Sequence, residues 1–322
     1  MSEQTSRFQP PLIVIVGPTG VGKTALSLKL ARALDGEIVS ADSRQVYRGM
    51  DIGTAKPTFQ EQAQVPHHLI DILDPDEDFG LATYQDLAYS AIQDIASRCR
   101  LPFLVGGTGQ YVRAIVEGWK IPRVPPDADL REKLYERAER RGHQALYDEL
   151  LALDPAAADL IDARNVRRVV RALEVCIKSG RPFSEQRGKV PPPYTILQIG
   201  LTMEREALYQ RVDARLDQMI QAGLIREVQE LLDQGYGWDL AAMSSLGYIQ
   251  FKGYLQGMET REEAIAAIKK ETRRFIRQQY NWFRLTNPRI HWFDAAASPY
   301  QAALELIGET LSRDTKGGAT KL

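Results

Sequence analysis

The chain has 322 residues, of which 44% are hydrophobic and 26% are charged, a composition typical of a globular protein with a buried core. The 41 Lys and Arg nearly cancel the 42 Asp and Glu, and this net charge of −1 argues against a general nucleic-acid binder. Two cysteines exclude a disulfide scaffold and a cysteine-rich zinc site. The apolar runs are too short to span a bilayer and the N-terminus lacks a secretory pattern, so we expect a cytoplasmic protein without membrane contact.

Strands alternate with helices over the first part of the chain, residues 1–119. Residues 12–16 (LIVIV) are a continuous apolar run typical of a strand buried on both faces, and a helix is expected after the turn at 17–24. Further strands are expected at 37–40, 68–72 and 101–105, and a further helix at 110–116. This alternation favours a doubly wound parallel α/β sheet.

The pattern changes near residue 120, at a Pro-rich linker. Stretches rich in Ala, Glu and Arg then predict helices at 127–141, 143–153 and 164–179, and a second proline run follows. We interpret 120–194 as a helical insertion domain. The core resumes over 195–310, with strands expected at 195–201 and 290–293 and helices at 204–221, 224–234 and 260–285. Residues 311–322 are expected to form a disordered tail.

The segment at 17–24 (GPTGVGKT) fits the phosphate-loop pattern G-x-x-x-x-G-K-[ST], and it lies between a buried strand and a helix, as that motif requires. Backbone N–H groups of such a loop surround phosphate oxygens, Lys23 supplies a point charge, and the Thr24 hydroxyl can hold Mg²⁺. The core is therefore expected to be P-loop NTPase-like. The diphosphate or nucleotide site would comprise Gly17, Pro18, Thr19, Gly20, Val21, Gly22, Lys23 and Thr24.

Two features of nucleotide hydrolases are missing from the sequence. There is no N-K-x-D element of the kind that reads guanine in GTPases. The strand at 101–105 runs into Gly-Gly-Thr-Gly, where a hydrolase carries an Asp for Mg²⁺, and Asp71 is only a weak substitute. We therefore expect a bound diphosphate whose chemistry is not hydrolysis.

Seven segments together resemble the tRNA dimethylallyltransferases, also called tRNA isopentenyltransferases. In family order from about residue 12 to 293 they are GPTGVGKTAL, DSRQVYRGMDIGTAKP, PHHLIDILDP, GGTGQY, NVRRVVRALEV, SLGYIQ and TRRFIRQQYNWFR. Gln110 departs from the family pattern, which has an apolar residue there. The resemblance implies transfer of a dimethylallyl group from dimethylallyl diphosphate to N6 of the adenine 3′-adjacent to the anticodon, in tRNAs reading codons that begin with U.

The resemblance also implies roles for individual residues. Asp42 follows the strand at 37–40, and the resemblance makes it the group that hydrogen-bonds N6 and accepts its proton, although Asp-Ser by itself is typical of a helix cap. The resemblance adds Thr108 and one arginine of the 204–221 helix at the diphosphate. Arg211 and Arg215 share a helix face, and we favour Arg215. The adenine pocket is expected to comprise Asp42, Ser43, Arg44 and Gln45.

Two segments are strongly basic despite the neutral total. Residues 164–189 hold eight basic and two acidic side chains, and residues 269–289 hold seven basic and one acidic, whereas residues 61–94 hold eight carboxylates and no Lys or Arg. We interpret the basic segments as the surface for a tRNA anticodon stem–loop and 61–94 as a solvated face. The family pattern and the charge place tRNA contacts at Arg167, Arg168, Val169, Val170, Arg171, Arg273, Arg274 and Arg277.

Three other functions share these motifs. An adenylate isopentenyltransferase would modify AMP or ATP and would not need the basic segments. A P-loop kinase of small molecules would bind ATP tightly, and a non-catalytic tRNA-binding protein would keep the loop as a relic. The favoured hypothesis expects tRNA and dimethylallyl diphosphate as partners, Mg²⁺ as cofactor, and a monomeric chain.

Overall fold

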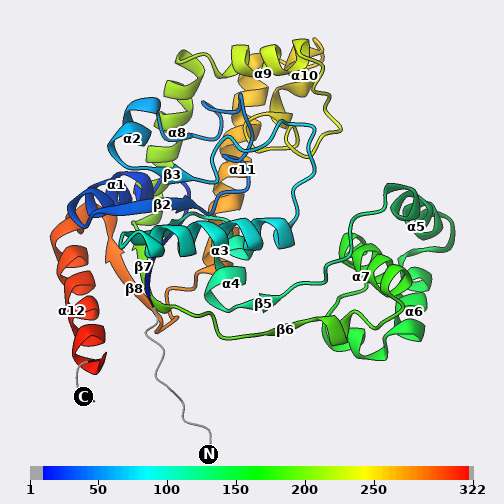
Figure 1. Cartoon of the computed structure of the whole chain (residues 1–322). Coiled ribbons are helices and arrows are strands. Elements are labelled where there is room, and N and C mark those ends of the chain that lie inside the picture. The colour runs from blue at the N-terminus through cyan, green and yellow to red at the C-terminus, as the bar shows by residue number, and fades with distance from the viewer. Residues whose placement is uncertain (1–9, 319–322) are drawn as a thin grey trace, which may run out of the picture. The chain divides into compact units, whose positions relative to one another are not determined.

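Six parallel strands form the central sheet of the protein in a computed structural model that describes residues 10–318 (Figure 1). Their order across the sheet is β3 (His67–His68), β2 (Gly36–Ser40), β4 (Leu101–Val105), β1 (Pro11–Val16), β7 (Thr195–Thr202) and β8 (Ile290–Asp294). The chain divides into two compact units, and this sheet belongs to the unit made by residues 10–116 and 193–318.

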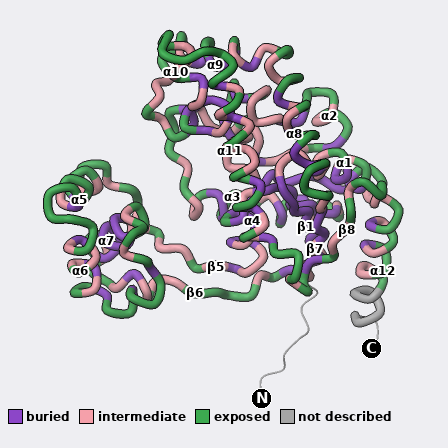
Figure 2. The backbone as a smooth tube through the Cα atoms, turned by 180° about the vertical axis from the view of Figure 1, so that it is seen from behind, coloured by how far each residue is buried: buried purple, intermediate pink, exposed green. Residues whose placement is uncertain are grey.

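Different helices cover the two faces of the sheet, because successive side chains of β1 point to opposite sides. Ile13 and Ile15 pack against α1 (Lys23–Ala33), α8 (Arg205–Gln221) and α12 (Tyr300–Gly318). Leu12, Val14 and Val16 pack against α3 (Leu81–Ser97) and α4 (Gly109–Val116). Residues 12–16 are all fully buried, as Figure 2 shows for the central strands, so the expected doubly wound core is confirmed.

A third hydrophobic cluster lies beyond the sheet in the same unit. It joins the loop that follows β2 to α9 (Leu224–Asp233) and α11 (Arg261–Trp282) through Met50, Met243 and Phe251. The short helices of this unit are α2 (Phe59–Gln64), α10 (Lys252–Leu255) and the 3₁₀ helices Ile249–Phe251 and Ala295–Ala297. The loop after β2 is therefore held on a helical support rather than projecting freely.

Residues 117–192 form the second unit. Its strands β5 (Trp119–Lys120) and β6 (Gly188–Lys189) pair antiparallel, and its core is built by α5 (Ala128–Arg141), α6 (His143–Leu153) and α7 (Val166–Ser179) around Leu134, Leu150 and Leu173. Two 3₁₀ helices, Pro155–Asp159 and Ser184–Gln186, complete it. The unit spans nearly the same residues as the insertion expected at 120–194.

Two local expectations were wrong. The strand expected at 68–72 ends at His68, because Leu69 and Asp71 have positive φ values of 62° and 55° that break the extended backbone. The disordered tail expected from 311 is helical up to Gly318, while residues 319–322 lie outside the described residues. Within residues 10–318, no helix combines the length and the apolar character needed to cross a membrane.

Candidate active site

Three neighbouring strands bring the predicted site residues to one edge of the sheet. β1 leads into the phosphate loop, β2 leads to Asp42, and β4 leads to the loop at 106–109 that contains Thr108. Because β2, β4 and β1 are adjacent and parallel, their carboxyl ends meet. Backbone N–H groups join these ends, from Ala41 to the Val105 carbonyl (2.7 Å), from Gly106 to that of Ile15 (3.2 Å) and from Thr108 to that of Ala41 (3.2 Å).

The phosphate loop has the backbone shape that an anion site requires. A Cβ atom on Gly17 would lie 2.4 Å from the Leu201 carbonyl oxygen, so only glycine fits where the loop leaves β1. α1 begins at Lys23, which directs the N–H groups of its first turn toward the loop. Lys23 Nζ donates to the carbonyl oxygens of Gly17 and Pro18, both at 2.9 Å.

Lys23 is electrostatically linked to Asp42 and Arg215. Burial lowers the pKa of Lys23 to about 8, the Asp42 carboxylate raises that pKa, and the Arg215 guanidinium lowers it. Burial also lowers the pKa of Arg215, against the opposing influence of Asp42. The three residues come from three different elements, so the fold concentrates charge at this edge of the sheet.

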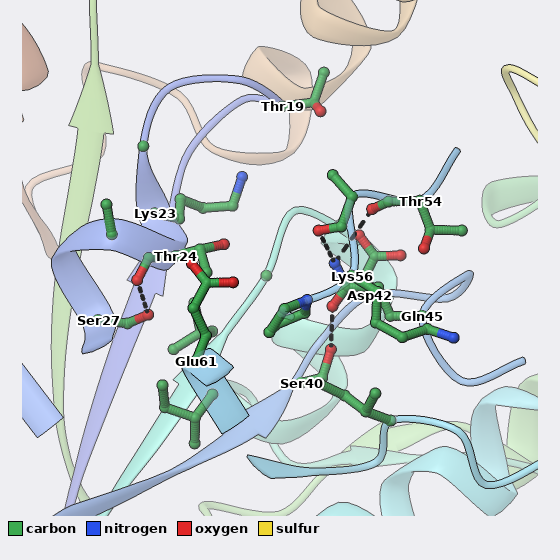
Figure 3. A pocket seen from close by; sticks show the side chains of 18 of the residues that line it. Thr19, Lys23, Thr24, Ser27, Ser40, Asp42, Gln45, Thr54, Lys56 and Glu61 are labelled. Carbon is green, nitrogen blue, oxygen red and sulfur yellow. Dashed lines mark hydrogen bonds between the residues drawn. The ribbon is translucent and has the colours of Figure 1, made fainter. Parts of the chain in front are cut away.

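These groups line a cavity of about 390 Å³ (Figure 3). Figure 3 shows Lys23 and Thr24 on one side of it and Asp42, Gln45 and Lys56 on the other. Arg211 and Arg215 contribute positive charge from α8. Apolar surface comes from Ile38, Ile70 and Val105. The cavity therefore offers an anion site, a carboxylate and an apolar wall within one enclosure.

Asp42 has one carboxylate oxygen engaged in its own loop. Its Oδ1 accepts the Arg44 N–H at 2.9 Å, which is the capping contact that Asp-Ser by itself predicts. No residue in the described part of the chain donates a hydrogen bond to its Oδ2. Thr108 supports the same loop, because its Oγ1 accepts the Ser43 N–H at 3.1 Å and donates to Ser43 Oγ at 3.4 Å.

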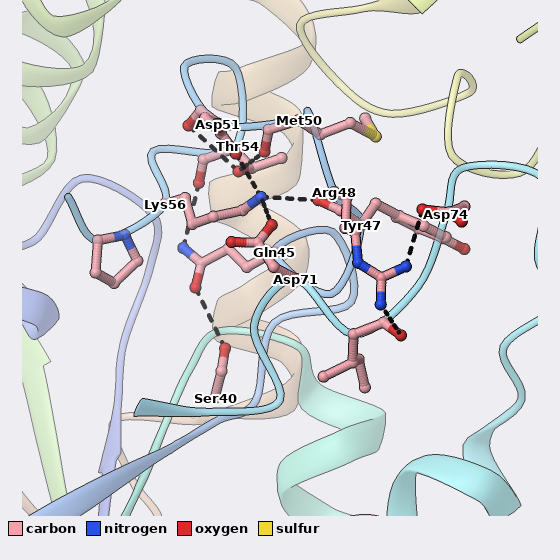
Figure 4. Close-up of polar contacts among 12 residues, drawn as sticks. Ser40, Gln45, Tyr47, Arg48, Met50, Asp51, Thr54, Lys56, Asp71 and Asp74 are labelled. Carbon is pink, nitrogen blue, oxygen red and sulfur yellow. Dashed lines mark hydrogen bonds and ion pairs between the residues drawn. The ribbon is translucent and has the colours of Figure 1, made fainter. Parts of the chain in front are cut away.

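Two residues expected to line the adenine pocket are engaged in structural contacts. Arg44 Nη1 donates to the Ala241 carbonyl at 2.6 Å, and its side chain does not line the cavity. Gln45 borders the cavity, but its amide donates to the carbonyls of Thr54 and Ala55, both at 3.3 Å, and its Oε1 accepts from Ser40 Oγ at 3.2 Å (Figure 4). In this structure Gln45 therefore lies at the expected pocket and cross-links the loop that borders it.

Lys56 is a site residue that was not predicted. Its ammonium donates to the Tyr47 carbonyl at 2.8 Å and pairs with Asp51 at 2.5 Å and with Asp71 (Figure 4), and only 3% of its side chain is exposed. Asp71 is therefore engaged by a lysine, which removes it as a candidate ligand for Mg²⁺. The family motif contained Lys56, but nothing in its local sequence marks a buried cation.

Glu227 is a second unpredicted residue, on the buried face of α9. Its Oε2 accepts the N–H groups of Asp51 (2.9 Å) and Ile52 (2.7 Å). Its Oε1 accepts the Gly53 N–H (3.0 Å) and the Tyr248 hydroxyl (2.6 Å), and burial together with this carboxylate raises the pKa of the Tyr248 phenol. Glu227 thus anchors the loop whose next residues, 54–57, line the cavity.

The expected tRNA contacts on α11 fall into two kinds. Arg273 donates to Asp213 Oδ2 at 2.7 Å and stacks over the Tyr209 ring at 5.2 Å, so it is committed within the protein. Arg274 and Arg277 are exposed, and their partners, Glu271 at 3.5 Å from Arg274 and the Tyr209 hydroxyl at Arg277, do not bury them. Of these three arginines, the two exposed ones are the residues available to an RNA phosphate.

The expected contacts on α7 are divided in the same way within the helical unit. Arg167 and Arg168 are exposed, whereas Arg171 pairs with the buried Glu174 and donates to the Val124 carbonyl at 2.8 Å. Val169 and Val170 are each 1% exposed in the core of the unit. The side chains of these two valines are therefore not available to tRNA in this structure, because their helix face is core.

Known families match this chain over most of its length. A family model described as IPP transferase matches residues 45–286, and one described as isopentenyl transferase matches residues 10–71. A tRNA dimethylallyltransferase from Roseiflexus sp. (strain RS-1) is 58% identical over 90% of this chain and 95% of its own. The chain belongs to the tRNA dimethylallyltransferase family. Another member, from Dehalococcoides mccartyi, is 49% identical over 94% of this chain and 93% of its own.

Solved structures of this family share the fold. The full-length tRNA isopentenylpyrophosphate transferase from Bacillus halodurans aligns with a TM-score of 0.71 at 44% identity, covering 95% of this chain and 98% of its own. A eukaryotic dimethylallyltransferase acting on tRNA aligns with a TM-score of 0.78 at 27% identity, covering 94% of this chain and 80% of its own. The P-loop NTPase-like core expected from the sequence is thereby confirmed.

Proposed function

We propose that this protein transfers a dimethylallyl group from dimethylallyl diphosphate to N6 of the adenine 3′-adjacent to the anticodon, in tRNAs reading codons that begin with U, and releases diphosphate. The observation that carries the proposal is the convergence of the phosphate loop, Asp42 and Arg215 on one cavity. An anion site and a carboxylate base in one enclosure suit an acceptor amine and a diphosphate leaving group. The identities of the prenyl group and of the tRNA acceptor are inferred from the names of the relatives.

The phosphate-loop side of the cavity would bind the diphosphate of the donor. Its N–H groups, Lys23 and Arg215 present positive charge before the reaction, and Arg211 lies beside the loop, with its guanidinium 3.4 Å from a Cβ built on Gly22. Negative charge grows on the diphosphate as the allylic C–O bond breaks. Groups already aimed at that charge lower the barrier, because they need not reorganise during the reaction.

Mg²⁺ fits the residues at this end of the cavity. The Thr24 hydroxyl stands at the start of α1 and borders the cavity. Among residues 10–318 no three His, Cys, Asp or Glu gather as a metal site, so the ion would rely on Thr24, diphosphate oxygens and water. Mg²⁺ commonly binds phosphates with few protein ligands. When bound, it would neutralise charge on the leaving diphosphate.

Asp42 would act on the acceptor. We assign the Oδ2 atom to hydrogen-bond the N6 amino group and to take its proton as the C–N bond forms, while Oδ1 keeps the loop in place through Arg44 N–H. Thr108, held by the Ser43 N–H, would turn its hydroxyl hydrogen from Ser43 Oγ, a long contact of 3.4 Å, to the diphosphate when the donor binds. The base and the leaving-group contacts thus come from adjacent strand ends.

The tRNA would contact exposed arginines on both units. Arg274 and Arg277 on α11 and Arg167 and Arg168 on α7 are accessible to phosphates. The helical unit is proposed to clamp the anticodon stem–loop, and the enzyme to act as a cytoplasmic monomer.

A nucleoside assay tests the proposed function. The protein is incubated with dimethylallyl diphosphate, Mg²⁺ and unmodified tRNA, or with AMP in place of tRNA, and the products are analysed by mass spectrometry. The proposal expects prenylated adenosine from the tRNA digest and little product from AMP. Prenylation of AMP without tRNA modification would instead support an adenylate isopentenyltransferase, and no transfer to either acceptor would contradict prenyl transfer altogether.

A further inference from the structure

Gln279 of α11 contacts both catalytic loops at once. Its Oε1 accepts the N–H of Thr19 in the phosphate loop at 2.8 Å, and its Nε2 donates to the Gly107 carbonyl, next to Thr108, at 3.1 Å. The residue is only 3% exposed. It therefore spans two loops that lie 260 and 172 residues away from it in sequence.

The amide is delivered by a rigid part of α11. One turn before it, Ile276 packs into the core on one sheet face, and four residues after it, Phe283 packs into the core on the other. The hydroxyl of the adjacent Tyr280 hydrogen-bonds Thr202 at 2.9 Å, at the end of β7. Because these contacts fix the helix, the position of the Gln279 amide is set by the core and not by the loops.

The loop around Thr108 is shaped to receive this side chain. A Cβ atom on Gly107 would lie 2.3 Å from Gln279 Nε2, and the next atom it would meet outside this side chain, the Gly17 carbonyl oxygen, is 3.5 Å away. Two residues later, a Cβ on Gly109 would lie 2.1 Å from the Trp282 ring of the same helix. The close approach of the 106–109 loop to α11 thus centres on Gln279 and Trp282.

We propose that Gln279 is a positioning residue that fixes the phosphate loop relative to the Thr108 loop, and so aligns the diphosphate-binding groups with Asp42. A primary amide serves both loops without charge, since its oxygen accepts an N–H and its nitrogen donates to a carbonyl. Gln279 does not line the cavity and is only 3% exposed, so its role is to position the loops and not to contact substrate. The inference rests on the proposed function, which supplies the two substrates that must be aligned.

The test compares two variants of Gln279 with a matched control. Gln279→Met keeps the approximate side-chain length and loses both hydrogen bonds. Gln279→Glu keeps an acceptor for Thr19 N–H but sets a carboxylate against the Gly107 carbonyl. The control is Gln85→Met, since Gln85 is also buried (4%) and donates to the Ala114 carbonyl at 2.9 Å, away from both loops.

We expect both Gln279 variants to lower kcat at saturating tRNA and donor by about 10- to 100-fold, the cost of misplacing reacting groups by about an ångström. The Kd for tRNA, measured by filter binding, should stay within about twofold. Gln85→Met should lower Tm and leave kcat unchanged. The inference fails if the Gln279 variants have a lower Tm but keep the wild-type kcat when assayed well below their melting temperature. The residue would then be merely structural.

Gly107→Ala probes the same contact from the other loop and covers the case in which the Gln279 variants do not fold. Its methyl group displaces Gln279 Nε2, so kcat should fall in the single variant. With Gln279→Ala added, the methyl group has space and should lower kcat no further. Full additivity of the two effects would overturn the inference. Failure of the wild-type protein to prenylate tRNA would instead contradict the proposed function, independently of these variants.

Discussion

The Lys23 ammonium lies beside the anion site. Burial lowers its pKa to about 8, because burial disfavours the charged form. The ammonium is present below pH 8 and is lost above it, so binding of inorganic diphosphate should be constant up to about pH 8. Above that pH the affinity should fall by up to about tenfold per unit. Isothermal titration calorimetry between pH 7 and pH 9.5 measures this directly.

The control for this prediction is Lys23→Met, which should bind diphosphate weakly with no step near pH 8. The same shift has an opposite consequence for folding. Between pH 8 and 10.5 the unfolded chain binds more protons at Lys23 than the folded chain, so this residue makes stability rise with pH there. A wild-type affinity that stays flat to pH 9.5 would show that Lys23 does not carry the anion site.

Asp42→Asn separates proton acceptance from loop structure. The amide oxygen can still accept the Arg44 N–H, so the loop should keep its shape, but the side chain cannot take a proton. We expect single-turnover transfer to fall by at least about 100-fold while tRNA binding changes by less than about threefold. Asp94→Asn, at an exposed aspartate of α3 paired with Arg98, is the control. Turnover near the wild-type rate would remove Asp42 from its assigned role.

At the scale of elements, local patterns predicted the sheet and most helices. The apolar run LIVIV predicts a buried strand, and the motifs at strand ends predict loop shape from a few neighbouring residues. β1, β4 and the phosphate loop were therefore predicted. α3 was not expected, because its buried positions Tyr84, Ala88 and Ile92 lie in the 61–94 segment, which was interpreted as an acidic solvated face. The carboxylates of that segment do not all form one solvated face, since Asp71 pairs with the buried Lys56.

The site was predictable where it depends on strand ends and unpredictable where it depends on distant supports. Asp42 and Thr108 lie at the same sheet edge because parallel strands align their ends, whereas their assigned roles came from the family resemblance. Glu227 and Gln279 act on loops more than 170 residues away, through side-chain hydrogen bonds that leave no periodic signal in the sequence. Family resemblance found the segment around Gln279 but not what it binds.

Glu227 provides a prediction about how α9 holds the loop at 51–53. Glu227→Gln replaces an oxygen that accepts hydrogen bonds with an amide nitrogen facing N–H or O–H donors, so the free energy of unfolding should fall by about 1–3 kcal/mol. Urea denaturation followed by circular dichroism measures the change. Glu230→Gln, on the exposed face of the same helix and paired with Arg226, should cost less than about 0.5 kcal/mol. Equal losses in the two variants would contradict the anchoring role.

At the scale of the whole molecule, the net charge of −1 includes the opposed contributions of two basic segments, 164–189 and 269–289, and an acidic segment, 61–94. Within those basic segments the structure further divides the arginines. Arg171 and Arg273 are tied to Glu174 and Asp213, whereas Arg167 and Arg168 have exposed side chains. A count of basic residues therefore overstates the positive charge available to RNA, and only the exposed arginines should release counterions on binding.

Salt dependence of tRNA binding tests this division. Affinity should fall steeply between 50 and 200 mM salt, and the joint variant Arg167→Ala, Arg168→Ala should reduce the slope of log K against log salt by about one to two units. Arg171→Ala should leave that slope nearly unchanged and lower Tm instead, because it strips a partner from the buried Glu174 carboxylate. If Arg171→Ala reduced the slope as much as the joint variant, the ion pair with Glu174 would not withhold Arg171 from RNA. A wild-type slope near zero would show that neither basic segment binds the tRNA backbone.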